Sequence, residues 1–590
     1  MEKLLFMKSF FKNVLANIVA MVILSVLFFF FFIIIIVIGS ASDSSSVEVK
    51  KNSVLTINLK TDIIDSPTEV QKDFFAFNKK SSEVLIYDAV EAIKKAKDDK
   101  NIEGISIEAD YLNAGITQID DLRAAILDFK KTGKFVLAYG NSVSQSAYYL
   151  GSVADEYYLN PSGGIELKGL STEVTFFKDF AEKYGIGIEV IRHGKFKSAV
   201  EPFIANGISP ENKEQLSTLL NDVWNSTSSK IAVSRKIDLP QFKIIVDSLY
   251  GMIPEESVKF KLADKLIQKT EYDQILKAKL KLNDKDKLYK ISLNKYVDSF
   301  KDEDKSGDKI AILYASGSIN SGDEYNEIYS EKYLQYIKDL QKDKKVKAVV
   351  LRINSPGGSA NASDEILFEL QQLKKKKPLI VSFGDYAASG GYYIAMAADK
   401  IYSQPNTLTG SIGVFGVLPY FKELANKNGV RSDVVATNAN SAYYSSLNGI
   451  SPHGVAMITK SVEGTYRRFV YFVTQNRKKS FEQIDAVGGG RVWSGTRAKE
   501  IGLVDELGSL NDAVKFAAGK ANLNNYKVKS YPEEKSSVEQ IFEGMNEDDI
   551  SAKVLKNKIG ESNYEILMQL TDKKLKSEVK MEMPFHIIID

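Results

Sequence analysis

The sequence contains no cysteine and little histidine. Its 590 residues include zero Cys and three His, which are His193, His453 and His586. The absence of cysteine excludes disulfide bonds, thiolate metal sites and a cysteine nucleophile. The histidines are far apart in the sequence and lack the spacing of metal ligands, so we expect no metal ion and no other cofactor.

A strong charge of one sign is also missing. The chain has 78 Lys and Arg against 76 Asp and Glu, which gives a formal net charge of +2. This balance predicts no nucleic-acid partner. The length exceeds that of a single hydrophobic core and predicts about two to four domains.

One long apolar run lies near the N-terminus. Residues 14–38 are apolar apart from Asn17 and Ser25. A helix rises about 1.5 Å per residue, so a run of this length can cross a hydrocarbon core of about 30 Å. The run predicts a transmembrane anchor at 14–38, preceded by a cytoplasmic tail at 1–13.

The residues that flank this run predict its orientation. Lys3, Lys8 and Lys12 precede it, whereas residues 39–46 carry no basic side chain. The positive-inside rule then puts the N-terminus in the cytoplasm and the rest of the chain on the exported, periplasmic side of the inner membrane. A cleaved signal peptide, with a small-residue site at 40–42, is the alternative, although the apolar run exceeds a usual h-region of about 7 to 15 residues.

The remainder of the sequence resembles two copies of one unit. One copy begins at 53–66 and the other at 309–322, and residues 134–161 align without gaps to residues 378–405 at a constant offset of 244. Short apolar strands alternate with longer helical patterns in both copies. This alternation predicts two α/β domains with parallel sheets.

Composition suggests where these domains end. The expected divisions are a first repeat domain at 50–269, a charged, solvated connector at 270–307, a second repeat domain at 308–525 and a surface appendage at 526–590.

The two copies have lost complementary residues. Ser389 of the second copy aligns with Gln145 of the first, so a serine is present at this position only once. Conversely, Lys197 precedes Ile208 in the first copy, whereas the corresponding residues 437–449 of the second contain no lysine. Two half-sites that are defective in opposite components indicate one composite active site shared between the copies.

Ser389 has the local sequence of a nucleophile at a strand-to-helix turn. The apolar strand 379–383 leads into it, and a helical pattern follows at 392–398. The unpaired backbone N–H of Gly390 at the helix start is a candidate oxyanion donor, and Gly358 in a Pro-Gly-Gly turn is a second. The ordinary alternative for such a serine is a helix N-cap.

A serine of this kind needs a base. Lysine can accept the hydroxyl proton only when neutral, which requires its pKa to fall from about 10.4 through burial. Lys197 is flanked by Phe196, Ala199 and Val200 and has a suitable apolar context. Lys195 and His193 are the neighbouring alternatives.

Five stretches together resemble a known family, the long, two-domain bacterial signal peptide peptidases, which are SppA-type serine proteases of the ClpP/crotonase fold group. They are GKFKSAVEPF (194–203), LRINSPGGSA (351–360), YAASGGYYIA (386–395), TLTGSIGVFG (407–416) and VWSGTRAKEIGLVDELG (492–508). The resemblance covers roughly residues 50–525 and the anchor. It implies an α/β fold of tandem duplicated ClpP/crotonase-like domains after an N-terminal transmembrane helix.

The resemblance also implies functional roles. Ser389 would be the nucleophile, Lys197 the general base, and Ser411 the group that orients the lysine amine. The expected function is a membrane-anchored Ser/Lys endopeptidase that degrades cleaved signal peptides and other apolar, unfolded peptides. The family further implies a homo-oligomer, by resemblance a tetramer.

Two other classes of function stay open at this point. The same fold group includes crotonase-like acyl-CoA enzymes, which also use backbone N–H pairs as oxyanion holes. A non-catalytic membrane scaffold is the second alternative. Retention of Ser389 in one copy and Lys197 in the other argues against the scaffold, because a scaffold would be expected to lose both.

Overall fold

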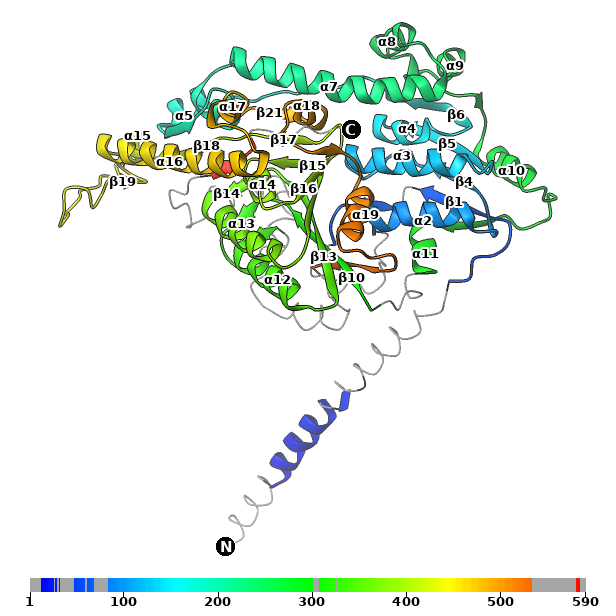
Figure 1. The fold of residues 1–590 in the computed structure, drawn as a ribbon, viewed down its shortest axis with the longest axis horizontal. Coiled ribbons are helices and arrows are strands. Elements are labelled where there is room, and N and C mark those ends of the chain that lie inside the picture. Colours follow the sequence, from blue (N-terminus) through cyan, green and yellow to red (C-terminus); the bar gives the residue numbers. More distant parts are fainter. Residues whose placement is uncertain are drawn as a thin grey trace.

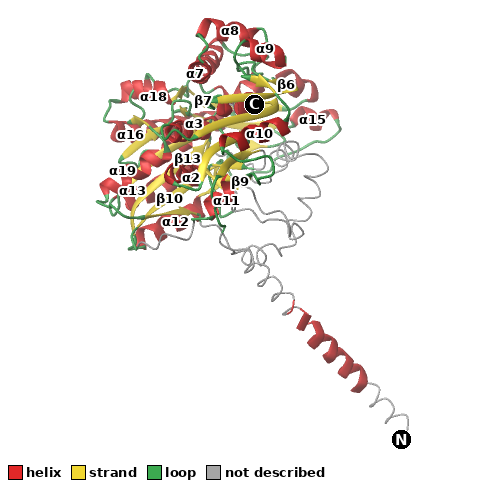
Figure 2. Cartoon of the chain, turned by 90° about the vertical axis from the view of Figure 1, so that its right-hand side faces the viewer, coloured by secondary structure: helices red, strands yellow, loops and turns green. Residues whose placement is uncertain are grey.

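The described part of the chain forms two α/β domains in which strands lie in the interior and helices outside (Figures 1 and 2). The computed structural model describes residues 12–25, 27–28, 31, 47–58, 61–67, 83–300, 307–324, 327–532 and 580–583. The expectation of two α/β domains with mainly parallel sheets is confirmed.

The first domain is built on a six-stranded parallel sheet. Its strand order is β8 (Lys265–Leu266), β6 (Glu156–Ile165), β5 (Phe135–Val143), β4 (Ile102–Glu108), β1 (Ser53–Asn58) and β9 (Tyr289–Ser292). Its helices include α2 (Ile86–Asp98), α3 (Ile116–Lys130), α4 (Gln145–Gly151) and α7 (Pro210–Arg235). The strands are nearly continuous apolar runs because a parallel sheet is covered on both faces.

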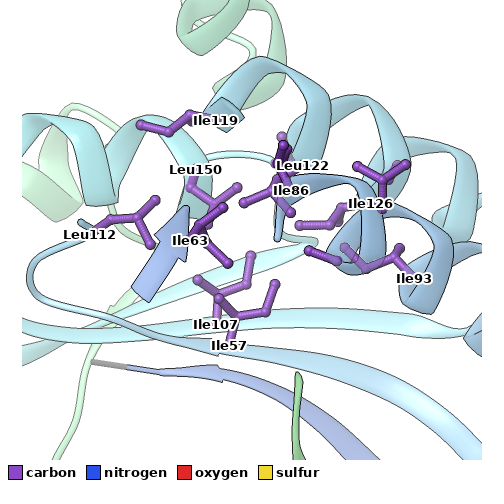
Figure 3. Packing of buried hydrophobic residues seen from close by; sticks show 14 of the residues in the cluster. Ile57, Ile63, Ile86, Ile93, Ile107, Leu112, Ile119, Leu122, Ile126 and Leu150 are labelled. Atoms are coloured by element: carbon purple, nitrogen blue, oxygen red, sulfur yellow. The ribbon is translucent and has the colours of Figure 1, made fainter. Parts of the chain in front are cut away.

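Helices α2 and α3 pack on this sheet through apolar side chains that recur at helical spacing. Ile86 and Ile93 of α2 lie one above the other at helical spacing, and Figure 3 shows both on the side that faces Ile57 and Ile107 of the sheet. Each of these four side chains is at most 2% exposed. Burial of apolar area at about 25 cal/mol per Å² makes this layer a main source of the domain's stability.

The charged segment at 270–307 differs from the solvated connector that we expected. Helix α10 (Lys269–Lys279), strand β9 and helix α11 (Leu293–Asp298) belong to the first domain, and β9 is an edge strand of its sheet. Tyr272 and Leu276, one helical turn apart, are fully buried. The lysines around them remain at the surface. Because these lysines are numerous, the sequence of the segment predicted a solvated connector.

The second domain has an eight-stranded sheet and a second layer of helices. The main strand order is β21 (Val492–Ser494), β17 (Leu408–Gly410), β15 (Leu379–Ala388), β13 (Val346–Ser355), β10 (Lys309–Ser316) and β23 (Lys527–Tyr531). In addition, β16 (Lys400–Ser403) pairs with β15, and β22 (Glu506–Leu507) pairs with β16. Its helices include α12 (Ser330–Lys342), α13 (Ala360–Lys374), α14 (Gly390–Ala395), α16 (Pro452–Arg477) and α19 (Leu510–Lys520).

A third sheet combines segments from both halves of the chain. Its order is β12 (Ile328–Tyr329), β11 (Ile319–Asn320), β14 (Gly357–Ser359), β24 (Lys580–Glu582), β18 (Val414–Tyr420) and β7 (Gly187–His193). β7 from the first half pairs antiparallel with β18 from the second over seven residue pairs, from Val414↔His193 to Tyr420↔Gly187. The segment expected as a surface appendage at 526–590 thus supplies two strands, β23 and β24.

The two domains share one hydrophobic core. One cluster contains Ile57 and Ile107 of the first sheet together with Ile312 and Val350 of the second. Helix α7 runs along both domains (Figure 1), and Asp222 on this helix forms an ion pair with Arg497 at 2.6 Å. The domains therefore form one continuous body.

Only part of the expected anchor is described. Residues 12–25 are helical, and 27–28 and 31 are the other described positions of the apolar run. Among the described residues, none of the helices has the length and apolar character needed to cross a membrane. The rest of the predicted span at 14–38 and most of the tail at 1–13 lie outside the described residues.

Candidate active site

Ser389 lies at the junction between β15 and α14. Its backbone has φ 54° and ψ −115°, a conformation that a non-glycine residue adopts only when its surroundings impose it. Its N–H donates to the carbonyl of Gly410 at 2.9 Å, and its own carbonyl accepts from Tyr393 at 2.8 Å. The strained turn holds the fully buried hydroxyl at the end of the strand.

The hydroxyl of Ser389 does not act as a helix cap. Although Ser389 occupies the N-cap position of α14, its side chain makes no cap hydrogen bond to the described residues of that helix. Its Oγ instead lies 2.9 Å from Nζ of Lys197. In the first copy, Ser144 does cap the corresponding helix α4, by accepting from Ala147. The N-cap alternative applies to the first copy and not to Ser389.

Lys197 reaches Ser389 from the other half of the chain. It follows β7, whose pairing with β18 brings the first half against the second. The side chain is fully buried, and Nζ donates to Ser389 Oγ at 2.9 Å, to Ser411 Oγ at 2.9 Å and to the Ser411 carbonyl at 3.3 Å. The structure therefore brings together the three side chains that the sequence singled out.

Glycines make room for Lys197. Gly490 has φ +85°, and a Cβ added there would lie 2.6 Å from the backbone nitrogen of Lys197. At Gly413 an added Cβ would come within 3.2 Å of Lys197 Cδ. The Gly488–Gly490 run carried this signal in the sequence, but nothing local connected it with a lysine almost 300 positions earlier. We did not predict these glycines as part of the site.

Neither alternative base approaches the serine in this way. Lys195 is exposed. The ring of His193 stacks on that of Tyr466 with 3.8 Å between centroids, and Tyr466 is a residue of α16 that belongs to the core of the second domain. Of the three candidates, Lys197 is the one whose side-chain nitrogen contacts Ser389 in the described structure.

The two predicted oxyanion donors lie side by side. Gly358, at φ +153°, is on β14, and Gly390 is the first residue of α14. A Cβ added at Gly390 would be 3.2 Å from the backbone nitrogen of Gly358. The backbone nitrogen of Gly358 therefore lies close to Gly390, the residue that follows Ser389.

Gln145 occupies the position in the first copy that is equivalent to Ser389. Its Oε1 accepts from the backbone N–H of Lys168 at 3.1 Å and of Gly169 at 2.9 Å, while Nε2 donates to the Gly169 carbonyl at 3.1 Å. An amide has both a donor and an acceptor, so it can hold this loop by itself. The first copy therefore has a hydrogen-bonded amide where the second copy has the Ser389 hydroxyl.

Glu201 is a further positioning residue that sequence reasoning missed. It is 3% exposed and accepts hydrogen bonds from Ser209 at 2.6 Å and Asn212 at 2.9 Å, which lie at the start of α7. Arg192, 3.9 Å from Glu201, also donates to the carbonyl of Lys197 at 3.2 Å. These contacts fasten the turn that carries Lys197 to the helix after it.

Among the described residues, no group of three or more His, Cys, Asp or Glu side chains is placed to hold a metal ion.

Comparison with known proteins places the chain in a family. The sequence profile of peptidase family S49 matches residues 128–283 and 371–524, and that of Clp protease matches residues 301–409. Protease 4 from Salmonella typhi is 34% identical over 520 residues, which cover 85% of this chain and 84% of that protein.

Two further relatives match over most of their length. Protease 4 from Haemophilus influenzae is 34% identical and covers 81% of this chain and 80% of its own. The chloroplastic serine protease SPPA from Arabidopsis thaliana is 33% identical and covers 80% of this chain and 70% of its own. The chain belongs to peptidase family S49 and is a serine protease with two ClpP/crotonase-like domains.

Proposed function

We propose that this protease cleaves peptide bonds with Ser389 as nucleophile and Lys197 as general base. The observation that carries the proposal is the 2.9 Å contact between Lys197 Nζ and Ser389 Oγ. A serine hydroxyl is a weak nucleophile unless a positioned base accepts its proton. Complete burial of the lysine favours the neutral amine that this role requires.

In the proposed reaction, Ser389 Oγ attacks the carbonyl carbon of the substrate as Lys197 takes the hydroxyl proton. The N–H groups of Gly358 and Gly390 donate to the resulting oxyanion. The ammonium of Lys197 then protonates the leaving amine, and the peptide bond breaks. Water hydrolyses the acyl-serine ester, with Lys197 again acting as the base. Ser411 holds the amine through a 2.9 Å hydrogen bond.

We propose that the substrates are cleaved signal peptides and other apolar, unfolded peptides. An extended peptide can bind to a strand such as β14, beside the oxyanion glycines, through backbone hydrogen bonds. The apolar side chains of the bound peptide then determine which peptide bond is cleaved. A crotonase-like acyl-CoA reaction would not need the Ser389–Lys197 contact, and a scaffold would need neither residue.

We further propose that residues 14–38 anchor the enzyme in the cytoplasmic membrane with its domains on the exported side. In the described helix 12–25, Leu15, Met21 and Leu24 are 63%, 72% and 70% exposed. Apolar side chains exposed in this density indicate a lipid or protein contact. Extraction of membranes at alkaline pH tests the anchor: the full chain should stay in the membrane pellet, and a chain without residues 1–40 should not. Recovery of the full chain in the supernatant would contradict it.

By resemblance to the long-form family, we propose a homo-oligomer, with a tetramer as the expected size. Apolar side chains exposed in the segments 177–180 and 430–435 support a contact between copies: Phe177, Phe180, Val430, Val434 and Val435. Sedimentation of the exported part should give a mass several times that of one chain.

The deciding experiment measures hydrolysis of a synthetic signal peptide and labelling by a fluorophosphonate probe. The wild-type enzyme should be labelled and active, whereas Ser389→Ala should lose labelling and at least about 10⁴-fold in kcat/KM. Ser144→Ala, which removes the serine that caps the equivalent helix of the first copy, is the matched control and should stay active. An active Ser389→Ala enzyme would refute the mechanism.

A further inference from the structure

A short segment from the C-terminal end of the chain lies beside the catalytic groups. Strand β24 pairs antiparallel with β14 on one side, with Gly358 opposite Met581, and with β18 on the other, where Phe415 is opposite Lys580. One residue beyond the strand, the N–H of Met583 donates to the Pro356 carbonyl at 2.6 Å. The segment 580–583 therefore fills the space between two strands of the active-site sheet.

The backbone of this segment runs past the oxyanion glycines. A Cβ added at Gly390 would be 3.2 Å from the Met581 carbonyl oxygen and 3.2 Å from the Gly358 nitrogen. A Cβ added at Gly357 would be 2.0 Å from the same oxygen and 2.7 Å from the Gly390 nitrogen. The Met581 carbonyl oxygen thus lies in the immediate surroundings of the two glycines to which the proposed mechanism assigns the oxyanion.

The two methionines of the segment are inserted in apolar surroundings. Met581 is fully buried and belongs to the core cluster of the second domain. Met583, at 5% exposure, packs with apolar residues from four different elements, which are Leu219, Ala388, Leu408 and Val492. Residues two apart on an extended chain point to the same side, so these apolar surroundings receive two side chains of one extended peptide. The thioether side chain of methionine adapts to surroundings of this kind.

The position of β24 in the sheet separates a substrate-like role from a purely structural one. In the strand order, β14 and β18 are joined through β24. Without it, both would present backbone donors and acceptors to the same slot, and an extended peptide could pair with them by adding a strand. An ordinary structural strand need not pass its carbonyl beside an oxyanion hole.

We propose that residues 580–583 occupy the peptide-binding slot of this protease in the manner of a substrate and compete with substrates for it. The proposal rests on the proposed catalytic role of the groups around Ser389. A tethered segment competes as a free peptide would at about millimolar concentration. Removal of the segment therefore lowers the apparent KM for added peptides and leaves kcat largely unchanged.

The test compares the full chain with one that ends at Val579, using an apolar fluorogenic peptide as substrate. We expect KM to fall about three- to tenfold in the shortened chain. A chain that ends at Met583 keeps β24 and should retain the KM of the full chain. Equal KM values for the full chain and the chain that ends at Val579 would overturn the proposal.

Substitutions test the same point if the shortened chain unfolds. Met581→Lys buries a charge in an apolar pocket and should release the segment, so it should also lower KM. Met457→Lys is the matched control, because Met457 is 49% exposed on α16 and its substitution should have no effect on KM. An unchanged KM in Met581→Lys would count against the proposal.

A binding measurement separates this proposal from the proposed mechanism. A fluorescent peptide with the sequence of residues 578–586 should bind Ser389→Ala ending at Val579 several-fold more tightly than full-length Ser389→Ala. Binding of this kind by an enzyme that proves inactive toward every peptide would refute the proposed function and support occupancy of the slot. An active enzyme with equal binding to both chains would refute the occupancy alone.

Discussion

At the scale of single residues, the amine of Lys197 depends on a fixed environment. Nζ contacts two hydroxyls and a carbonyl, and the ring of Phe415 lies 5.8 Å away. A neutral amine in this position can accept a proton, donate it to a leaving group and return to its starting state. Geometry and burial together therefore distinguish Lys197 from the other lysines near it.

Substitution of this lysine distinguishes a base from a structural cation. Lys197→Arg keeps a positive charge but cannot release a proton near neutrality, so it should be as inactive as Lys197→Ala, at least about 10³-fold below wild type in kcat/KM. Peptide turnover by purified, folded variants is the measurement. Lys195→Ala and His193→Ala serve as controls and should keep most of the activity. An active Lys197→Arg together with an inactive His193→Ala would assign the base to histidine.

Gln145 occupies the position of the first copy that corresponds to Ser389, and its role there is structural. Because its three hydrogen bonds join it to the backbone of Lys168 and Gly169 in the first copy, Gln145→Ala should keep peptide turnover. Loss of these buried partners should cost about 1–3 kcal/mol of unfolding free energy, measured by denaturant titration. A loss of turnover without a loss of stability would give this residue a chemical role.

At the scale of elements, the turn at Gly490 decides whether Lys197 can lie where it does. An added Cβ would meet the backbone of Lys197, so Gly490→Ala should displace the amine and lower kcat by roughly 10²-fold. Gly429→Ala is the matched control, because Gly429 also has positive φ, +76°, but an added Cβ meets nothing within 4 Å. Both variants should lose about 1 kcal/mol of stability, and only the first should lose activity. Equal kcat values in the two variants would contradict this account.

Elements also show how far the sequence could predict the structure. The repeat at constant offset and the alternation of strands and helices predicted two α/β domains, and the complementary losses predicted Ser389 and Lys197 as partners. The pairing of β7 with β18 could not be read in the same way, since strands distant in sequence carry no local signal of their partner. The burial of Tyr272 and Leu276 was hidden by surrounding lysines for a similar reason. The short strand β24 has too few residues to show any period.

At the scale of the whole molecule, a buried polar network joins the two domains behind the active site. Arg352, fully buried, forms an ion pair with Asp65 of the other half at 2.7 Å. Asp385, four residues before Ser389, accepts from the N–H and hydroxyl of Thr117 at 2.9 and 3.0 Å. Burial raises the pKa of Asp385, and the nearby Asp65 adds to this. Strand β15, which leads into Ser389, is thus held from the first domain.

Asp121 makes this interface sensitive to pH. Burial raises its pKa to about 7, and Asp120 and Asp65 act in the same direction against Arg352 and Gln404. A carboxyl with a raised pKa in the folded state stabilises the fold fully below its unfolded pKa of about 4, and this contribution is lost as pH rises through about 7.

Asp121→Asn cannot ionise and should escape this loss. The melting temperature of the variant relative to wild type should therefore increase by about 2–4 °C between pH 5 and pH 8. Differential scanning calorimetry across this range is the measurement, and Asp433→Asn on an exposed loop is the control that should show no such trend. A difference that stays constant with pH would remove Asp121 from this role.

The pairing of β7 with β18 has a consequence for biosynthesis. The ribosome makes Lys197 first and Ser389 192 positions later, but the strand that holds the lysine turn in place ends only at Tyr420. At about 5–20 residues per second, roughly 10 to 40 s separate the lysine from its partner strand. A nascent or prematurely terminated chain can thus contain both Lys197 and Ser389 and still be unable to hydrolyse neighbouring proteins. If Lys197 is the base, as proposed, translation through β18 is a precondition for hydrolysis.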